Sequence, residues 1–75
     1  MPFPRISIDP AQMGGVPCIR NLRIPVAMVV RLVAQGLEVD AILAEYPDLQ
    51  ADDVAEALRF AASAVDERTL PLTGT

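Results

Sequence analysis

The sequence predicts a mainly α-helical, three-helix domain of the helix-turn-helix type, preceded by a short N-terminal β-ribbon. In the second half, apolar residues recur at spacings of three and four, which is the period of an amphipathic helix. In the first third of the chain, short stretches alternate between polar and apolar residues, and glycines and prolines separate the predicted segments. Because 75 residues suffice for one domain, we expect residues 1–68 to fold together and residues 69–75 to form a flexible tail.

The β-ribbon is expected within residues 5–24. Residues 5–9, Arg-Ile-Ser-Ile-Asp, alternate between polar and apolar, which predicts a strand. Gly14 and Gly15 permit positive φ and predict a loop. Residues 18–24 alternate again, and their mixed faces suit a second short strand. A two-stranded ribbon is marginally stable alone, so it should pack on the helices.

Prolines and glycine set the limits of the predicted helices. Pro25 suits the start of a first helix that runs from Val26 to Gln35 and stops at Gly36. A second, short helix begins at Glu38 or Asp40 and ends before Pro47, because proline disfavours the helical conformation of the residue before it. The third helix begins near Ala51. Its expected apolar stripe comprises Val54, Ala57, Leu58, Ala61 and Val65.

The first helix is apolar around most of its circumference, since only Arg31 and Gln35 are polar. A helix of this kind is buried on most sides, and the rest of a small chain offers little mass to cover it. It could simply be the central helix, wrapped by the other elements. We favour a homodimer or higher oligomer instead. The expected interface residues are Val26, Val29, Val30 and Val33.

The composition argues against catalysis and against general binding to nucleic acid. Cys18 is the one cysteine and histidine is absent, so a disulfide, a zinc site and a thiol–imidazole pair are not expected. We therefore expect a buried Cys18, no enzyme, no metal or other cofactor and no small-molecule substrate. The net charge of −4 gives no general attraction to DNA or to anionic membranes. Without a signal peptide or a membrane-spanning run, we expect a cytoplasmic protein.

Several short motifs occur in a fixed order along the chain. They are Arg5-Ile6-x-x-Asp9-Pro10, Gly14-Gly15-x-Pro17-Cys18-Ile19-Arg20, Arg23-Ile24-Pro25-Val26, Gly36 and Tyr46-Pro47-x-Leu49. This set, within about residues 5–65, resembles the bacterial family called domain of unknown function 433. The sequence departs from the family at Asn21-Leu22, where Gly-Thr is frequent, and at the helix-capping positions Glu38 and Gln50, where serine or threonine is frequent.

The resemblance implies a homeodomain-like three-helix fold and a function. Many members are regarded as antitoxins of type II toxin–antitoxin modules. The chain is therefore expected to bind and neutralise a PIN-like ribonuclease toxin, and repression of its own promoter is compatible with that role. Such a nuclease has a carboxylate site around magnesium, which an arginine can occupy through bidentate hydrogen bonds.

Arg20 and Arg23 are the first candidates for this contact. Together with Arg5, they could instead contact DNA phosphates. A third interpretation is that they form internal ion pairs with carboxylates of the chain. Carboxylates such as Asp9, Glu38 or Asp40 could be their partners.

A stand-alone helix-turn-helix transcriptional regulator is the alternative function. Its third helix would enter the major groove of DNA. That helix begins with Asp52 and Asp53, followed by Glu56, and carboxylates are repelled by phosphates. Only Gln50 and Arg59 suit DNA contact there. We therefore expect any DNA binding to come from the ribbon arginines or from a partner's basic surface.

Overall fold

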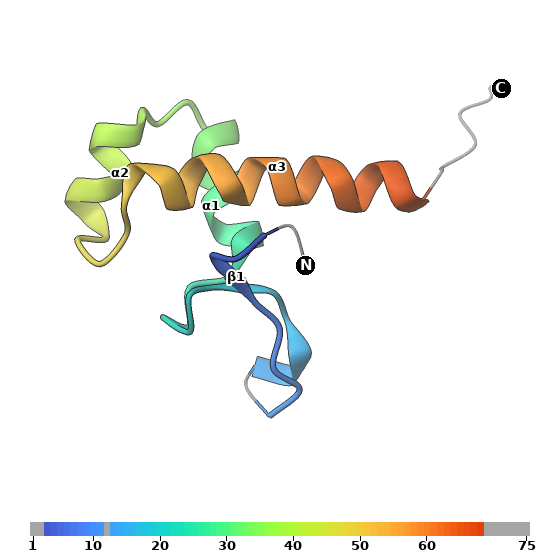
Figure 1. Ribbon diagram of the computed structural model, residues 1–75. Coiled ribbons are helices and arrows are strands. Elements are labelled where there is room, and N and C mark those ends of the chain that lie inside the picture. Colours follow the sequence, from blue (N-terminus) through green and yellow to red (C-terminus); the bar gives the residue numbers. More distant parts are fainter. Residues whose placement is uncertain (1–2, 12, 69–75) are drawn as a thin grey trace, which may run out of the picture.

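Two short helices and a short ribbon are arranged around one long helix in the computed structural model, which describes residues 3–11 and 13–68. The elements are β1 (Ile6–Ser7), the 3-10 turn η1 (Met13–Gly15), β2 (Cys18–Ile19), α1 (Val26–Ala34), α2 (Val39–Glu45) and α3 (Ala51–Arg68). In Figure 1, α3 runs across the molecule, α1 crosses it, α2 lies near its start and the ribbon lies below. The predicted mainly α architecture is confirmed; the tail predicted for residues 69–75 lies outside the described residues.

The ribbon pairs β1 and β2 in antiparallel register. Ile6 faces Ile19, and Ser7 faces Cys18. Ile6, Cys18 and Ile19 are buried, so the ribbon contributes side chains to the core instead of standing free. This packing is what a two-stranded ribbon needs for stability.

The second strand is much shorter than predicted. It ends at Ile19, because Arg20, Asn21 and Arg23 have φ angles of 42°, 63° and 62°. These values lie outside the β region, so the chain turns where the alternating pattern of residues 18–24 predicted a strand. We call residues 20–23 the arginine turn.

The first helix ends as the sequence predicts. Gly36 has a φ of 93°, a conformation that glycine adopts without a Cβ clash. Its N–H donates to the Val33 carbonyl, and the Leu37 N–H donates to the Leu32 carbonyl. These two hydrogen bonds form a Schellman motif, which satisfies carbonyls that the end of α1 leaves free.

The core lies where the three helices meet the ribbon. Among its side chains, Ile19, Val29, Ile42 and Val54 are almost completely buried. At its edge, the Phe3 and Phe60 rings meet edge to face with centroids 5.3 Å apart. The ribbon, α1, α2 and α3 thus share one apolar centre.

The predicted apolar stripe of α3 is buried only in part. Val54 and Ala57 belong to the core, whereas Leu58 is 38% and Val65 is 60% exposed. The stripe lies on a helix as expected, but the other elements cover only part of it, and the C-terminal half of α3, which carries Val65, extends beyond them (Figure 1). The helical period identifies a face, but it does not say whether another element covers that face.

Candidate functional site

Asp53 is the centre of a polar cluster that joins the ribbon to the start of α3. Its side chain is fully buried. The carboxylate accepts hydrogen bonds from Arg5 Nη1 at 2.9 Å, from Arg20 Nε at 3.0 Å and from Arg20 Nη2 at 2.9 Å. The Gln50 N–H donates to it as well, at 2.8 Å. These bonds offset the cost of removing the carboxylate from water.

The same contacts cap α3. Gln50 precedes the first helical residue, and Asp53 reaches back to its N–H as the acidic member of a capping box does. Arg5 ties the ribbon to this helix start through a 3.0 Å hydrogen bond from Nη1 to Gln50 Oε1. Its backbone N–H also donates to Glu56 Oε2. We call Arg5, Arg20, Gln50, Asp53 and Glu56 the Asp53 cluster.

The charges of the cluster reinforce one another. Burial disfavours ionisation of Asp53, but the hydrogen bonds from Arg20, from the Gln50 N–H and from Arg5 together hold the pKa of its carboxyl below the ordinary value. The hydrogen bond to Asp53 in turn raises the pKa of Arg20. Both groups are therefore ionised at neutral pH.

Two of the candidate arginines thus make contacts within the chain. Arg5 and Arg20 both pair with Asp53. Internal pairing was one of the three interpretations of these residues, and the acceptor is Asp53 instead of the examples Asp9, Glu38 and Asp40. In the sequence, Asp53 looks like an ordinary acidic residue of a first helical turn, and nothing local indicates a contact 33 residues away.

Arg23 is placed differently. Its side chain is exposed, and it forms no ion pair with any described residue. Its backbone lies in the left-handed region, with a φ of 62°. For a residue other than glycine this conformation costs about 1 kcal/mol or more, and it persists only where the surroundings impose it.

Several contacts hold the arginine turn in this conformation. Besides its bonds to Asp53, Arg20 donates from Nη2 to the Asp48 carbonyl at 2.8 Å. The Asn21 N–H donates to Ser7 Oγ at 3.1 Å. The turn is thereby anchored at its base, and Arg23 is held outward at its far end.

Gln50 and Arg59, the predicted DNA contacts of α3, differ in availability. The Gln50 side-chain oxygen accepts a hydrogen bond from Arg5. The Arg59 side chain is 63% exposed, with its guanidinium 3.7 Å from Glu56 Oε1. Glu56 is buried and accepts a hydrogen bond from the Arg5 backbone N–H of the ribbon. Arg59 is the more accessible of the two candidates.

The valines predicted to form an oligomer interface divide into two groups. Val26 and Val29 are buried in the chain's own core, so they offer little surface to another chain. Val30 and Val33 are half-buried and pack against the core from outside. Much of the apolar surface of α1 is therefore buried within the chain, and α3 is the element in most extensive contact with it.

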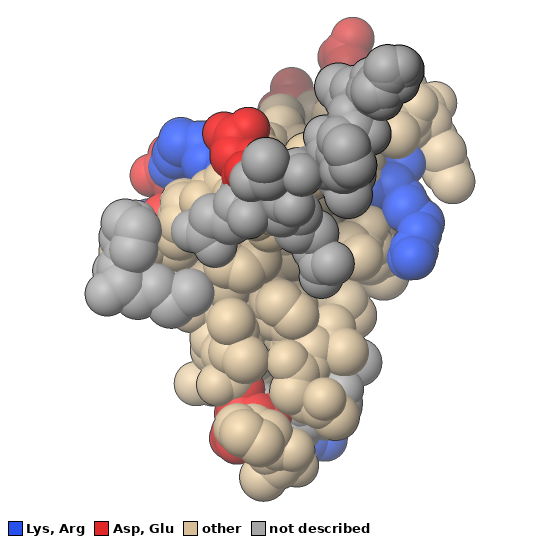
Figure 2. Space-filling view, turned by 90° about the vertical axis from the view of Figure 1, so that its right-hand side faces the viewer, with Lys and Arg blue, Asp and Glu red and all other residues tan. Residues whose placement is uncertain are grey.

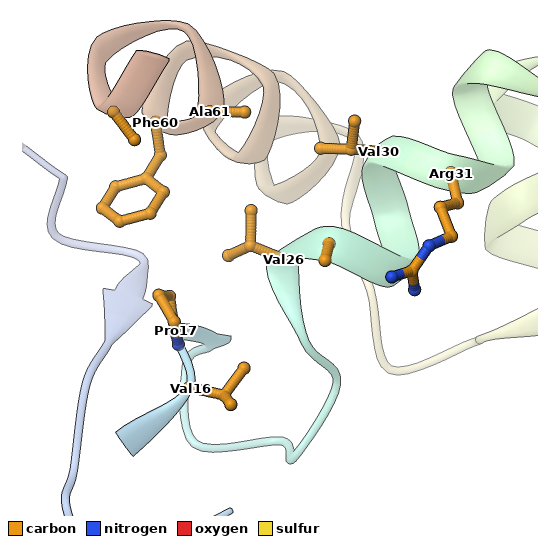
Figure 3. A pocket seen from close by; sticks show the side chains of 9 residues that line it. Val16, Pro17, Val26, Val30, Arg31, Phe60 and Ala61 are labelled. Atoms are coloured by element: carbon orange, nitrogen blue, oxygen red, sulfur yellow. The ribbon is translucent and has the colours of Figure 1, made fainter. Parts of the chain in front are cut away.

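An open apolar groove remains between α1, α3 and the segment before β2, with a volume of about 410 Å³. Figure 3 shows Val26 and Val30 projecting from α1, with Phe60 and Arg31 toward opposite ends. The lining residues are Val16, Pro17, Val26, Ala27, Val30, Arg31, Phe60, Ala61 and Ala64. We call this surface the α1–α3 groove; among the described residues that line it, Arg31 is the one with a charge.

Cys18 is a buried core residue, as predicted, and its thiol donates to the Val16 carbonyl at 3.3 Å. Among the described residues, no group of three or more histidine, cysteine and acidic side chains is placed to hold a metal ion. In the same part of the chain, no helix combines the length and the apolar character needed to cross a membrane.

Comparison with known proteins relates this fold to one family. Residues 6–61 match the family model described as "Protein of unknown function (DUF433)". The chain is also similar, with a TM-score of 0.76 and 36% sequence identity, to the crystal structure of a DUF433 member protein from Anabaena variabilis ATCC 29413. This match covers 84% of the chain and 62% of that protein, so the chain spans about three-fifths of its length. A comparison with curated proteins gave no match. The chain belongs to the DUF433 family.

Proposed function

We propose that the protein is an antitoxin-like adaptor that binds and neutralises a PIN-like ribonuclease, and that Arg23 enters the nuclease site. The observation that carries the proposal is the arginine turn. It holds an exposed arginine, without an ion pair to any described residue, on a backbone that its neighbours keep in a strained conformation. The family resemblance supplies the antitoxin role, and the turn supplies a residue suited to it.

The chemistry of the contact is a match between a planar cation and a cluster of carboxylates. A guanidinium binds carboxylates through two parallel hydrogen bonds, which a magnesium site of a ribonuclease can accept. The anchored turn lowers the entropy lost on binding, because its backbone is already ordered. In a chain with a net charge of −4, Arg23 is a local positive site that attracts an acidic pocket.

The start of α3 argues against a stand-alone DNA-binding regulator. The Asp52 side chain is 80% exposed in its first turn, and phosphates would repel it. The Gln50 side-chain oxygen accepts a hydrogen bond from Arg5, so the amide is not free to make the two-point contact, with one donor and one acceptor, that reads an adenine edge. A regulator would depend on Arg23 and Arg59 for its contacts.

Co-purification with the product of the neighbouring reading frame tests the proposal, followed by a ribonuclease assay of that product. The wild-type chain should co-purify and suppress cleavage of RNA. Arg23→Ala should lose both effects, whereas Arg59→Ala, a matched change of an exposed arginine, should keep them. Full inhibition by Arg23→Ala, or a neighbouring product without nuclease activity, would overturn the proposal. Tight, salt-dependent binding of the isolated chain to its promoter, weakened by Arg23→Ala, would favour the regulator.

A further inference from the structure

We propose that two copies of this chain associate reciprocally, with the C-terminal half of α3 of each copy seated in the α1–α3 groove of the other. The inference goes beyond the proposed nuclease binding and does not depend on Arg23. It rests on the fact that one chain carries both an apolar groove and an exposed apolar helix face.

The exposed apolar face runs from the middle of α3 into its C-terminal half and consists of Leu58, Ala62 and Val65, which we call the α3 strip. Their spacings of four and three place them on one side of the helix. All three are exposed, Val65 at 60% and Leu58 at 38%. Apolar residues at such spacings are what a helix presents when it docks in a hydrophobic groove.

The α3 strip cannot fill the groove of its own chain. Phe60, Ala61 and Ala64 line the groove from a different face of the same helix. Since α3 is a wall of the groove, its other faces are directed elsewhere. A second copy has no such restriction, and its α3 extends beyond the other elements, as Figure 1 shows.

The charges near the two surfaces are complementary. Arg31 lines the groove, exposed and without an ion pair to any described residue. Asp66 follows Val65 along α3, which places a carboxylate at the margin of the α3 strip. Figure 2 views the molecule from the side at which α3 ends, and most of the described side chains in the lower middle of this view are uncharged. A strip with an acidic margin thus matches a groove with a basic end.

Reciprocal docking also gives a closed assembly. If each copy inserts its strip into the other, the contact is formed twice and no unfilled groove remains to extend the assembly. Two contacts also bury twice the area of one, and a stable interface requires a large buried area. A small polar ligand suits the groove less well, because the described residues that line it bring no set of polar groups together.

Sedimentation equilibrium of the full chain tests the inference. The wild type should be a dimer. Val65→Asp should raise its dissociation constant about tenfold or more, because it places a charge in an apolar contact. Val39→Asp is the matched control: Val39 is an exposed valine at the start of α2, outside both surfaces, and its change should leave the dimer intact.

A charge reversal identifies the contact. Arg31→Asp and Asp66→Arg should each weaken the dimer, and the double variant should restore it, with circular dichroism verifying that every variant is folded. A folded wild type that stays monomeric would overturn the inference, as would a dimer unaffected by Val65→Asp. A folded double variant that remains monomeric would overturn the assigned contact. The wild type could be monomeric while Val65→Asp and Arg31→Asp, but not the control variant, abolish binding to the nuclease. That result would assign the groove to a segment of the nuclease instead of a second copy.

Discussion

Arg20 and Asp53, 33 residues apart in the sequence, form a two-point contact in which Nε lies 3.0 Å from Oδ1 and Nη2 lies 2.9 Å from Oδ2. The contact fixes the arginine turn against the first turn of α3. It holds the short ribbon, whose strands have two residues each, against the start of α3. The partner surface that we propose depends on this contact, since Arg23 belongs to the same turn.

Asp53→Asn should destabilise the protein. The amide keeps the shape of the carboxylate, but it loses the charge and directs N–H donors at two guanidinium groups. We expect a loss of about 2 kcal/mol in the free energy of unfolding, measured by urea denaturation. Asp52→Asn is the control, because the Asp52 side chain is 80% exposed, and it should change stability by less than about 0.5 kcal/mol. Equal effects of the two changes would contradict the importance of the Asp53 cluster.

The stability of the wild type should fall in acid. The pKa of Asp53 is lower in the folded chain than its ordinary value, so the stabilisation is fully present above that ordinary value, about 3.9. It is lost as the pH falls through the lower, folded pKa. The urea midpoint should therefore decline below about pH 4, and less steeply in Asp53→Asn. Identical profiles of the two proteins would show that Asp53 does not contribute.

Arg20 and Arg23 should differ in what their removal changes. Arg20→Ala removes hydrogen bonds to Asp53 and to the Asp48 carbonyl, so its urea midpoint should be lower than that of the wild type. Arg23→Ala removes an exposed side chain without an ion pair to any described residue, and the free energy of unfolding should stay within about 0.5 kcal/mol. If Arg23→Ala lowered the urea midpoint more than Arg20→Ala does, Arg23 would be the arginine that stabilises the fold.

Val29→Ala should lower stability by about 2 kcal/mol, because the side chain is fully buried in the core and its loss leaves a cavity. Val39→Ala, at an exposed position of α2, should have an effect of less than about 0.5 kcal/mol. Both can be measured by urea denaturation. A negligible effect of Val29→Ala would place this residue outside the core and return it to the predicted interface.

The helices were predictable from the sequence because local residues set their limits. Pro25 and Gly36 bracket α1, and Pro47 follows the end of α2. The arginine turn was not predictable as a turn, since its alternating residues imitate a strand; Asn21, which tolerates positive φ, was the one local indication.

The contacts of the candidate site were harder to predict than the elements that carry them. The partner of Arg5 and Arg20 is distant in the sequence, and the local pattern assigned Asp53 an ordinary role at a helix start. In the same way, the sequence placed Val65 on an apolar face, but whether that face is covered depends on where the other helices end.

Titration calorimetry tests the central claim most directly: Arg20 builds the turn, and Arg23 binds the partner. The titrated partner is the nuclease from the neighbouring reading frame. Arg23→Ala should weaken binding about 30-fold or more, as expected for loss of one member of a buried charge contact, while its urea midpoint matches that of the wild type. Unchanged affinity of Arg23→Ala for that nuclease would contradict the account.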